Sequence, residues 1–372
     1  MKLTLLALLA TISGGQAILT VLVVGTPVGQ AGQAGLPVFH SVLPKAKVPF
    51  VAADGSGGFY VSHVADGALK VAHVRDGKWS PARTITSDAK LLVNSADHPS
   101  IAVDGKRLLA SWSTRNAHGT IIHLAESKDG GATWSKARTP HPQMVSAFGF
   151  ASLLPKEAVF LDGRGLPGGM EGAGDMQLRT ADALLDPRVC DCCQTAAVMT
   201  SAGAVVAYRD RSDKEIRDIS IVRKTAKGWT APKTLHADGW QINGCPVNGP
   251  QLDARGKRVV AAWFTAAQNA PRVQVVFSGD AGATFSAPLR VSERTTGRVD
   301  VAWIDDRHAV VTYLSEGALH ARRVSRDGTM GAPVKIAAAA GGFPRLAVSK
   351  QNVGVVWSAD DGVHFQLLEG VK

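Results

Sequence analysis

The sequence predicts an all-β fold, a β-propeller of four-stranded blades, and three observations lead to this prediction. Short β-branched and aromatic runs alternate with Gly, Asp and Asn turns, and almost no long stretch has a helical period. One pattern recurs along the chain: a strand, a small turn, and a second strand that ends in an aromatic residue. No linker divides residues 35–372, so we expect one repeat domain there.

Seven copies of this pattern define the expected blades. The first is PFVAADGSGGFYVSHV, and six more follow at a spacing of about 44 to 55 residues, the length of one four-stranded blade. The six later copies end in Trp112, Phe160, Tyr208, Trp263, Tyr313 and Trp357. We expect these aromatic side chains to pack between neighbouring sheets. Six blades with an irregular first segment are the alternative.

The two ends of the chain are expected to share one blade. Residues 343–370 supply only about three strands, and PVFHSV near residue 40 can supply the fourth. The blades of a propeller must close into a ring because neighbouring blades cover each other's apolar faces. Such a shared blade would join the two ends of the domain.

The N-terminal 34 residues have the pattern of an export signal. Lys2 is the only charged residue before Lys45, and a small-residue cleavage site near Ala34 follows a long apolar core. The alternative is an uncleaved membrane anchor, since about 20 apolar residues can span a bilayer. We therefore expect a signal peptide at 1–34 and a periplasmic or secreted protein, which contacts a membrane only if that segment remains.

The formal net charge of +10 is spread along the chain. It lacks the Lys/Arg runs and interleaved aromatics that mark a nucleic-acid groove, so nucleic acid is not an expected partner. An anionic glycan or an envelope protein suits a basic surface better. We expect a monomer.

Two turns share the pattern Ser-x-Asp-x-Gly-x-Thr followed by an aromatic residue. They are SKDGGATW and SGDAGATF, with SADDGVHF as a decayed third copy; their structural residues are Asp129, Gly131, Trp134, Asp280, Gly282 and Phe285. The pattern resembles the Asp-box, or BNR repeat, of the sialidase superfamily. Segments such as DPRVCDCCQTA resemble those of bacterial exported proteins labelled sialidase-like. The Asp is expected to accept N–H bonds across the turn and the Gly to take a positive φ.

The resemblance implies a binding face opposite the Asp-box turns. It consists of the segments that lead into each first strand and the loops between second and third strands. The candidate ligand-binding residues on it are Asp162, Arg164, Arg209, Asp210, Arg211, Arg298, Asp300 and Arg345. A planar guanidinium suits bidentate binding of a carboxylate, so an anionic glycan or a protein ligand is expected.

An exo-alpha-sialidase-type glycoside hydrolase is the second hypothesis. The resemblance implies three arginines on the substrate carboxylate, a Tyr activated by a Glu, and an Asp as acid/base. The Arg-Ile-Pro motif expected in the first blade is absent, because that stretch reads VPFVAAD. Of the three tyrosines, Tyr208 and Tyr313 occupy positions expected to pack between sheets. The catalytic residues are therefore left unassigned.

The four cysteines, Cys190, Cys192, Cys193 and Cys245, precede two consecutive blades, so we expect them to be neighbours. A disulfide from Cys245 to one of the other three would join these blades in an oxidising compartment. A Cu or Zn site, helped by Met170, Met176 or His98, is the competing interpretation, and it would make the protein a copper- or zinc-binding one. A redox-active pair is a further alternative.

Overall fold

The computed structural model describes residues 8–13, 16–21, 39–117, 119–141, 148–164 and 176–368 of the 372-residue chain. The predicted metal-site helper Met170 lies outside these residues.

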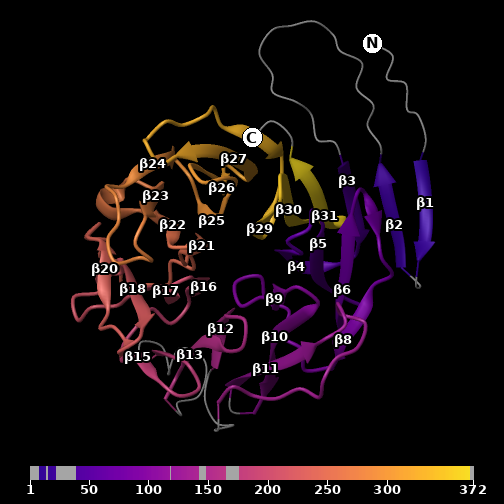
Figure 1. Ribbon diagram of the computed structural model, residues 1–372, viewed down its shortest axis with the longest axis horizontal. Coiled ribbons are helices and arrows are strands. Elements are labelled where there is room, and N and C mark those ends of the chain that lie inside the picture. Colours follow the sequence, from indigo (N-terminus) through magenta and orange to yellow (C-terminus); the bar gives the residue numbers. More distant parts are fainter. Residues whose placement is uncertain are drawn as a thin grey trace, which may run out of the picture.

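Seven antiparallel sheets surround a central axis, as Figure 1 shows, and they confirm the all-β propeller with seven blades rather than six. Blades 1 and 2 contain β4 (Lys47–Ala53), β5 (Phe59–Ala65), β6 (Ala68–Arg75), β7 (Lys78–Trp79), β8 (Arg83–Ser87), β9 (Ser100–Asp104), β10 (Arg107–Asn116) and β11 (Gly119–Ser127). Blades 3 and 4 contain β12 (Phe148–Leu153), β13 (Ala158–Asp162), β14 (Gln177–Arg179), β15 (Leu184–Asp186), β16 (Ala196–Thr200), β17 (Gly203–Arg209), β18 (Ile219–Thr225), β19 (Gly228–Trp229) and β20 (Lys233–His236).

The remaining blades complete the ring. Blades 5 and 6 contain β21 (Gln251–Arg255), β22 (Arg258–Thr265), β23 (Arg272–Ser278), β24 (Leu289–Glu293), β25 (Gly297–Trp303), β26 (His308–Ser315), β27 (Ala318–Ser325) and β28 (Val334–Ala337), with the 3-10 turn η2 (Ala267–Asn269) before β23. Blade 7 contains β29 (Gly341–Ser349), β30 (Asn352–Ala359), β31 (Gly362–Leu368) and β3 (Phe39–Pro44).

Proline interrupts the outer strands of several blades. In blade 4, β19 and β20 both pair with β18, and Pro232 lies between them. Pro81 separates β7 from β8 in the same way. In blade 2 the described fourth strand is reduced to a bridge between Leu124 and Arg138, and Pro140 follows. Proline lacks the N–H that a strand ladder needs, which explains these breaks.

The aromatic residues that end the second strands are buried, as predicted, and each packs against the preceding blade. Trp263 contacts the apolar cluster of blade 4, and Tyr313 contacts that of blade 5. Trp357 does the same with blade 6. Each aromatic thus covers one face of the preceding sheet, and a closed ring leaves no blade with an uncovered face.

The predicted shared blade is confirmed. β3 pairs with β31 along its full length, from Phe39 opposite Leu367 to Pro44 opposite Gly362. β1 (Leu8–Ser13) and β2 (Gln16–Val21) form a hairpin that extends this sheet beyond β3. Blade 7 has four strands without that hairpin, and cleavage near Ala34 stays a prediction. Within the described residues, no helix has the length and apolar character of a membrane span.

The two turns of the Asp-box type share one set of hydrogen bonds. In the turn after β23, Ser278 Oγ donates to Asp280 Oδ1 at 2.8 Å, and Thr284 N and Oγ1 donate to the same carboxylate at 2.9 and 2.7 Å. The turn after β11 has the same bonds around Asp129. The glycine of the shared pattern has a positive φ in both turns, 86° at Gly131 and 79° at Gly282.

The interpretation of SADDGVHF as a third copy is wrong. This segment contains the turn between β30 and β31, the second and third strands of blade 7. The two good copies follow third strands, so the third sequence lies at a different place in its blade.

Candidate ligand-binding site

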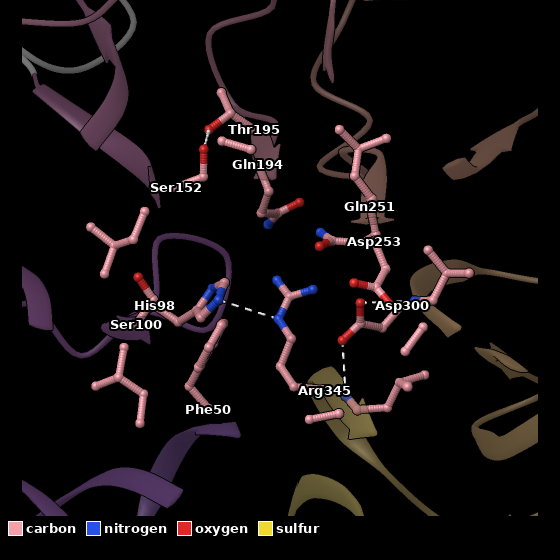
Figure 2. Close-up of a pocket in the computed structure, with 18 of the residues that line it drawn as sticks. Phe50, His98, Ser100, Ser152, Gln194, Thr195, Gln251, Asp253, Asp300 and Arg345 are labelled. Atoms are coloured by element: carbon pink, nitrogen blue, oxygen red, sulfur yellow. Dashed lines mark hydrogen bonds between the residues drawn. The ribbon is translucent and has the colours of Figure 1, made fainter. Parts of the chain in front are cut away.

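A cavity of about 290 Å³ lies among the first strands of all seven blades and the segments that lead into them. The polar side chains that line it are Asp97, His98, Ser100, Ser152, Gln194, Thr195, Gln251, Asp253, Asp300 and Arg345, and all except Asp97 are labelled in Figure 2. Phe50 and Phe150 add aromatic surface. We call this space the axial cavity; it combines an apolar wall with many hydrogen-bonding groups.

Arg345, on β29, places a buried guanidinium in the axial cavity between His98 and Asp300 (Figure 2). Its Nε donates to His98 Nε2 at 3.2 Å, so Nε2 of His98 carries no proton and acts as the acceptor. Within the described residues, Arg345 Nη1 has no hydrogen-bond partner and no carboxylate lies at ion-pair distance. Burial lowers the pKa of Arg345, and the charge of Asp300 opposes that effect. An anionic ligand would supply the missing partner.

Three aspartates of the cavity wall join neighbouring blades. Each accepts a hydrogen bond from a backbone N–H of the next blade: Asp97 from Phe150 N at 2.7 Å, Asp253 from Trp303 N at 2.7 Å and Asp300 from Leu346 N at 2.8 Å. Burial raises the pKa of Asp97 and of Asp253 to about 6 and also raises the pKa of Asp300, although these hydrogen bonds oppose it. Asp97 and Asp253 therefore lose their protons, and the cavity wall becomes more negative, as the pH rises through about 6.

Gln194 connects three blades at the axial cavity. Its Nε2 donates to the carbonyl of Ala96, before blade 2, at 2.8 Å. Its Oε1 accepts from the N–H of Gly249, before blade 5, at 3.0 Å. A Cβ on Gly249 would lie 2.1 Å from the Gln194 carbonyl oxygen, so only glycine allows this approach. These bonds hold the segments around the cavity in place.

The ligand residues predicted from the sequence lie in three places. Asp300 and Arg345 line the axial cavity. Asp162 and Arg164 line a separate cavity of about 360 Å³ at blade 3, where Asp162 lies 3.8 Å from Arg179. The other four, Arg209, Asp210, Arg211 and Arg298, lie on the segments around the cysteines. The structure therefore does not bring all eight candidates to one ligand.

Arg209 is a structural residue of blades 4 and 5. Its buried guanidinium donates to the carbonyls of Asn248, Arg217 and Phe264 at 2.5 to 2.9 Å. It also lies 4.8 Å from the centre of the Trp240 ring. Four bonds to backbone carbonyls occupy the guanidinium edge, so Arg209 has little capacity left for a ligand.

The other three candidates of this group have protein partners. Arg211 pairs with Glu215 at 2.9 Å, and Asp210 accepts from Ser220 Oγ at 2.7 Å. Arg298 stacks over Phe343 at 4.1 Å and donates to the Val247 carbonyl.

The cysteines lie together at the segments that lead into blades 4 and 5. Cys190 Sγ lies 3.2 Å from Cys193 Sγ and 3.7 Å from Cys192 Sγ, and Cys245 is within 4.8 Å of Cys192. All four are free thiols, so the disulfide expected from Cys245 is not formed. Hydrogen bonds from the neighbouring thiols lower the pKa of Cys190. Three adjacent sulfurs can hold a thiophilic metal ion.

The two other described side chains that were expected to assist metal binding, Met176 and His98, have their contacts elsewhere. Met176 is in the apolar core of blades 3 and 4, and His98 bonds to Arg345 in the axial cavity.

The residues of a Tyr–Glu nucleophile are not assembled at the axial cavity. Among the described lining residues there is no tyrosine and no glutamate. Tyr208 is buried and donates to Asp186 at 2.5 Å, and Tyr313 stacks on His320 within blade 6. Both tyrosines thus have the packing role expected of their positions.

Four residues of the axial cavity were not predicted from the sequence: Phe50, Gln194, Gln251 and Asp253. The strand register shows how Gln251 could have been predicted. In four blades, the residue of the first strand that faces the cavity pairs with the residue just before the aromatic that ends the second strand. These four residues are Ser100, Gln251, Asp300 and Arg345. An alignment anchored on those aromatics places all four on the axis. Asp253 then follows, because it is two residues from Gln251 and therefore on the same face of β21.

No family model matches the chain, and no curated protein matches it either. Solved structures with the same fold include an α-L-arabinofuranosidase from Fusarium graminearum in complex with an iminosugar inhibitor, 12% identical, with a TM-score of 0.50 over 88% of this chain and 92% of that one. A polysaccharide lyase, ulvanlyase, bound to -[GlcA(1-4)Rha3S]-, is 11% identical, with a TM-score of 0.50 over 87% and 93%.

The intramolecular trans-sialidase from Ruminococcus gnavus is 9% identical, with a TM-score of 0.48 over 87% and 94% of the two chains. At such identities the likeness concerns the fold.

Proposed function

We propose that this propeller binds a terminal acidic sugar of a glycan in the axial cavity, with the sugar carboxylate on Arg345. The observation that carries the proposal is the buried guanidinium of Arg345, which lacks an anionic partner and leaves Nη1 without a hydrogen bond within the described residues. A buried cation is strongly disfavoured unless it is paired, so a carboxylate ligand would remove an existing penalty. The planar guanidinium allows that carboxylate to bind in a bidentate manner.

The remaining wall suits the hydroxyl groups and the ring of a sugar. Ser100, Gln251 and Asp253 offer hydrogen-bonding groups to hydroxyls. The rings of Phe50 and His98 stack at 5.5 Å with 20° between their planes and add aromatic surface to the wall. The volume of about 290 Å³ lies near the lower end of small-molecule sites, about 300 to 1,000 Å³, and favours one sugar unit over a protein segment.

Two solved structures of this fold are in keeping with a carbohydrate ligand. The Fusarium protein is an arabinofuranosidase, and the ulvanlyase is bound to -[GlcA(1-4)Rha3S]-. Because these likenesses concern the fold alone, they support the class of ligand only by analogy.

Calorimetric titration of the chain with acidic and neutral sugars tests the proposal. Sialic acid, glucuronic acid and galacturonic acid are compared with glucose and galactose. We expect binding of at least one acidic sugar, and Arg345→Gln should weaken it at least about 30-fold, which corresponds to a charged hydrogen-bonded pair of about 2 kcal/mol. The matched control Arg290→Gln, at an exposed position of β24, should leave binding unchanged.

Two results would contradict this function. One is a folded Arg345→Gln variant that binds acidic sugars as tightly as the wild-type chain does. The other is the absence of binding to any member of a wider panel of acid-terminated oligosaccharides.

Glycoside hydrolysis is the second candidate, because Asp97 and Asp253 have a pKa of about 6 and line the same cavity. A carboxyl group in that range can protonate a leaving group and a second carboxylate can assist. Release of fluorophore from a panel of aryl glycosides, with loss in Asp253→Asn, would support hydrolysis. A chain that binds acidic sugars but turns over none of these substrates is a binding protein.

We also propose that the site works in the periplasm or outside the cell, after cleavage near Ala34. The apolar segment 1–34 supports this localisation. Edman sequencing of the chain recovered from fractionated cells should give a new N-terminus near residue 35, and recovery of the intact chain in the cytoplasm would overturn it.

A further inference from the structure

The predicted ligand-binding arginines of blades 4 to 6 surround sulfur atoms. Arg217 Nη1 lies 3.2 Å from Cys190 Sγ. Cys190 N donates to the backbone carbonyl of Arg209 at 3.0 Å, and Arg298 donates to the carbonyl of Val247, two residues after Cys245. One guanidinium group thus contacts the thiols, and two more belong to the segments beside them.

Two of these cations have no acidic partner. Arg217 pairs with Glu215 at 2.7 Å. Within the described residues, neither Arg209 nor Arg298 has a carboxylate at ion-pair distance, and Arg209 is only 2% exposed. A buried positive charge needs a compensating negative one nearby. A negatively charged centre beside these guanidinium groups would compensate that charge.

The sulfur geometry fits a shared metal ion better than a disulfide. The separations from Cys190 to Cys193 and to Cys192 are 3.2 and 3.7 Å, and all three sulfurs lie within 4.8 Å of one another. A disulfide requires about 2.05 Å. An ion about 2.3 Å from each of three thiolates requires sulfurs about 3.8 to 4.0 Å apart, which needs shifts of less than about 1 Å here.

We propose that Cys190, Cys192 and Cys193 form a three-thiolate site for Cu(I) beside the axial cavity. The donor set is sulfur alone, which selects soft ions. Structural Zn(II) almost always takes four ligands, whereas these three sulfurs form one group, and Cys245 lies with Asp191 and Cys192 in a second one. Cu(I) held by three thiolates forms a centre of charge −2 beside Arg217, and each sulfur that carries a proton releases it on binding.

The proposed metal site also lies next to the axial cavity. Cys193 directly precedes Gln194, whose amide bonds to Ala96 and Gly249 at that cavity. The proposal does not depend on the identity of the sugar, because the metal site is tested by metal binding alone.

Anaerobic titration of the reduced full chain with Cu(I), in competition with bicinchoninate, tests this site. We expect one equivalent of Cu(I) held per chain, with an X-ray absorption spectrum of a sulfur-only environment. Cys190→Ser and Cys193→Ser should each lose this equivalent. Cys245→Ser, at an exposed cysteine, is the matched control and should retain it.

Circular dichroism and the melting temperature establish that each variant is folded. If Cys190→Ser or Cys193→Ser does not fold, Cys192→Ser, at a half-buried position, replaces it.

Three results would overturn the assignment. They are no retention of Cu(I) by the reduced wild-type chain, retention of Zn(II) that Cu(I) does not displace, and equal loss of Cu(I) in Cys245→Ser. A disulfide between Cys190 and Cys193 that withstands reduction in the native chain, shown by mass spectrometry, would overturn it as well.

Discussion

Arginine has three different roles in this molecule, and its surroundings decide which. Arg209 has its guanidinium bonded to backbone carbonyls and holds blades together. Arg345 keeps Nη1 unused beside a cavity and is available to an anion. Arg217 faces the sulfur of Cys190. Residue type alone therefore predicts the chemistry that is available but not the partner that receives it.

The aspartates of the axial cavity should make stability depend on pH. Asp97 and Asp253 have a pKa of about 6 in the fold, against an ordinary value of 3.8, so the folded chain holds these protons more tightly. Their stabilising contribution is complete below about pH 4 and is lost as the pH rises through about 6. The free energy of unfolding of Asp253→Asn, relative to wild type, should therefore rise by about 2 to 3 kcal/mol from pH 4 to pH 7.

Urea unfolding at the two pH values measures this difference. Asp129→Asn is the control: hydrogen bonds from Thr133 and Ser127 lower the pKa of Asp129 to about 2, so its contribution is present above about pH 4 and is lost as the pH falls toward 2. Its difference from wild type should stay constant between pH 4 and pH 7. A constant difference for Asp253→Asn as well would refute the raised pKa.

At the scale of elements, the turn after β23 is expected to contribute to stability through a buried glycine. A Cβ on Gly282 would lie 3.3 Å from Val205 of the preceding blade, and its φ is +79°. Gly256, in the turn between β21 and β22, has a φ of +62°, and a Cβ there would have no atom within 4 Å. Both substitutions strain the backbone, but only the first also crowds a neighbour.

We expect Gly282→Ala to lower the free energy of unfolding by about 2 to 3 kcal/mol and Gly256→Ala by about 1 kcal/mol. Denaturant titration of both variants measures the difference. Equal losses would show that this turn does not pack tightly against blade 4.

The sequence allowed the blades to be predicted much better than the axial cavity. The aromatic residues that end second strands, such as Trp263, are local signals repeated in each blade. The cavity depends on bonds between blades, such as the one from Trp303 N to Asp253, which lie far apart in the chain. Gln194 was missed for the same reason, because its partners Ala96 and Gly249 belong to other blades.

At the scale of the whole molecule, β3 closes the ring and should be needed for stability. Its residues Phe39 and Leu43 are buried in apolar clusters that contain side chains of both blade 7 and blade 1. A chain that begins at residue 35 keeps this strand, whereas one that begins at residue 45 loses it. Loss of the two apolar side chains and of the strand ladder should reduce stability by about 5 kcal/mol or more, and the melting temperature by about 10 °C or more.

Differential scanning calorimetry of the two shortened chains tests this expectation. The chain from residue 35 should melt within about 2 °C of the full chain, because blade 7 has four strands without β1 and β2. A chain from residue 45 with an unchanged melting temperature would show that β3 is dispensable.

The pairing of β3 with β31 also sets the order of events in folding. Phe39 is among the first domain residues to be synthesised, and its partner Leu367 is among the last. Blades 1 to 6 can form as their strands become available, but the ring stays open until the final strand has been made. Premature termination anywhere before β31 therefore leaves an open ring with unpaired strand edges, which is the form most prone to aggregation and proteolysis.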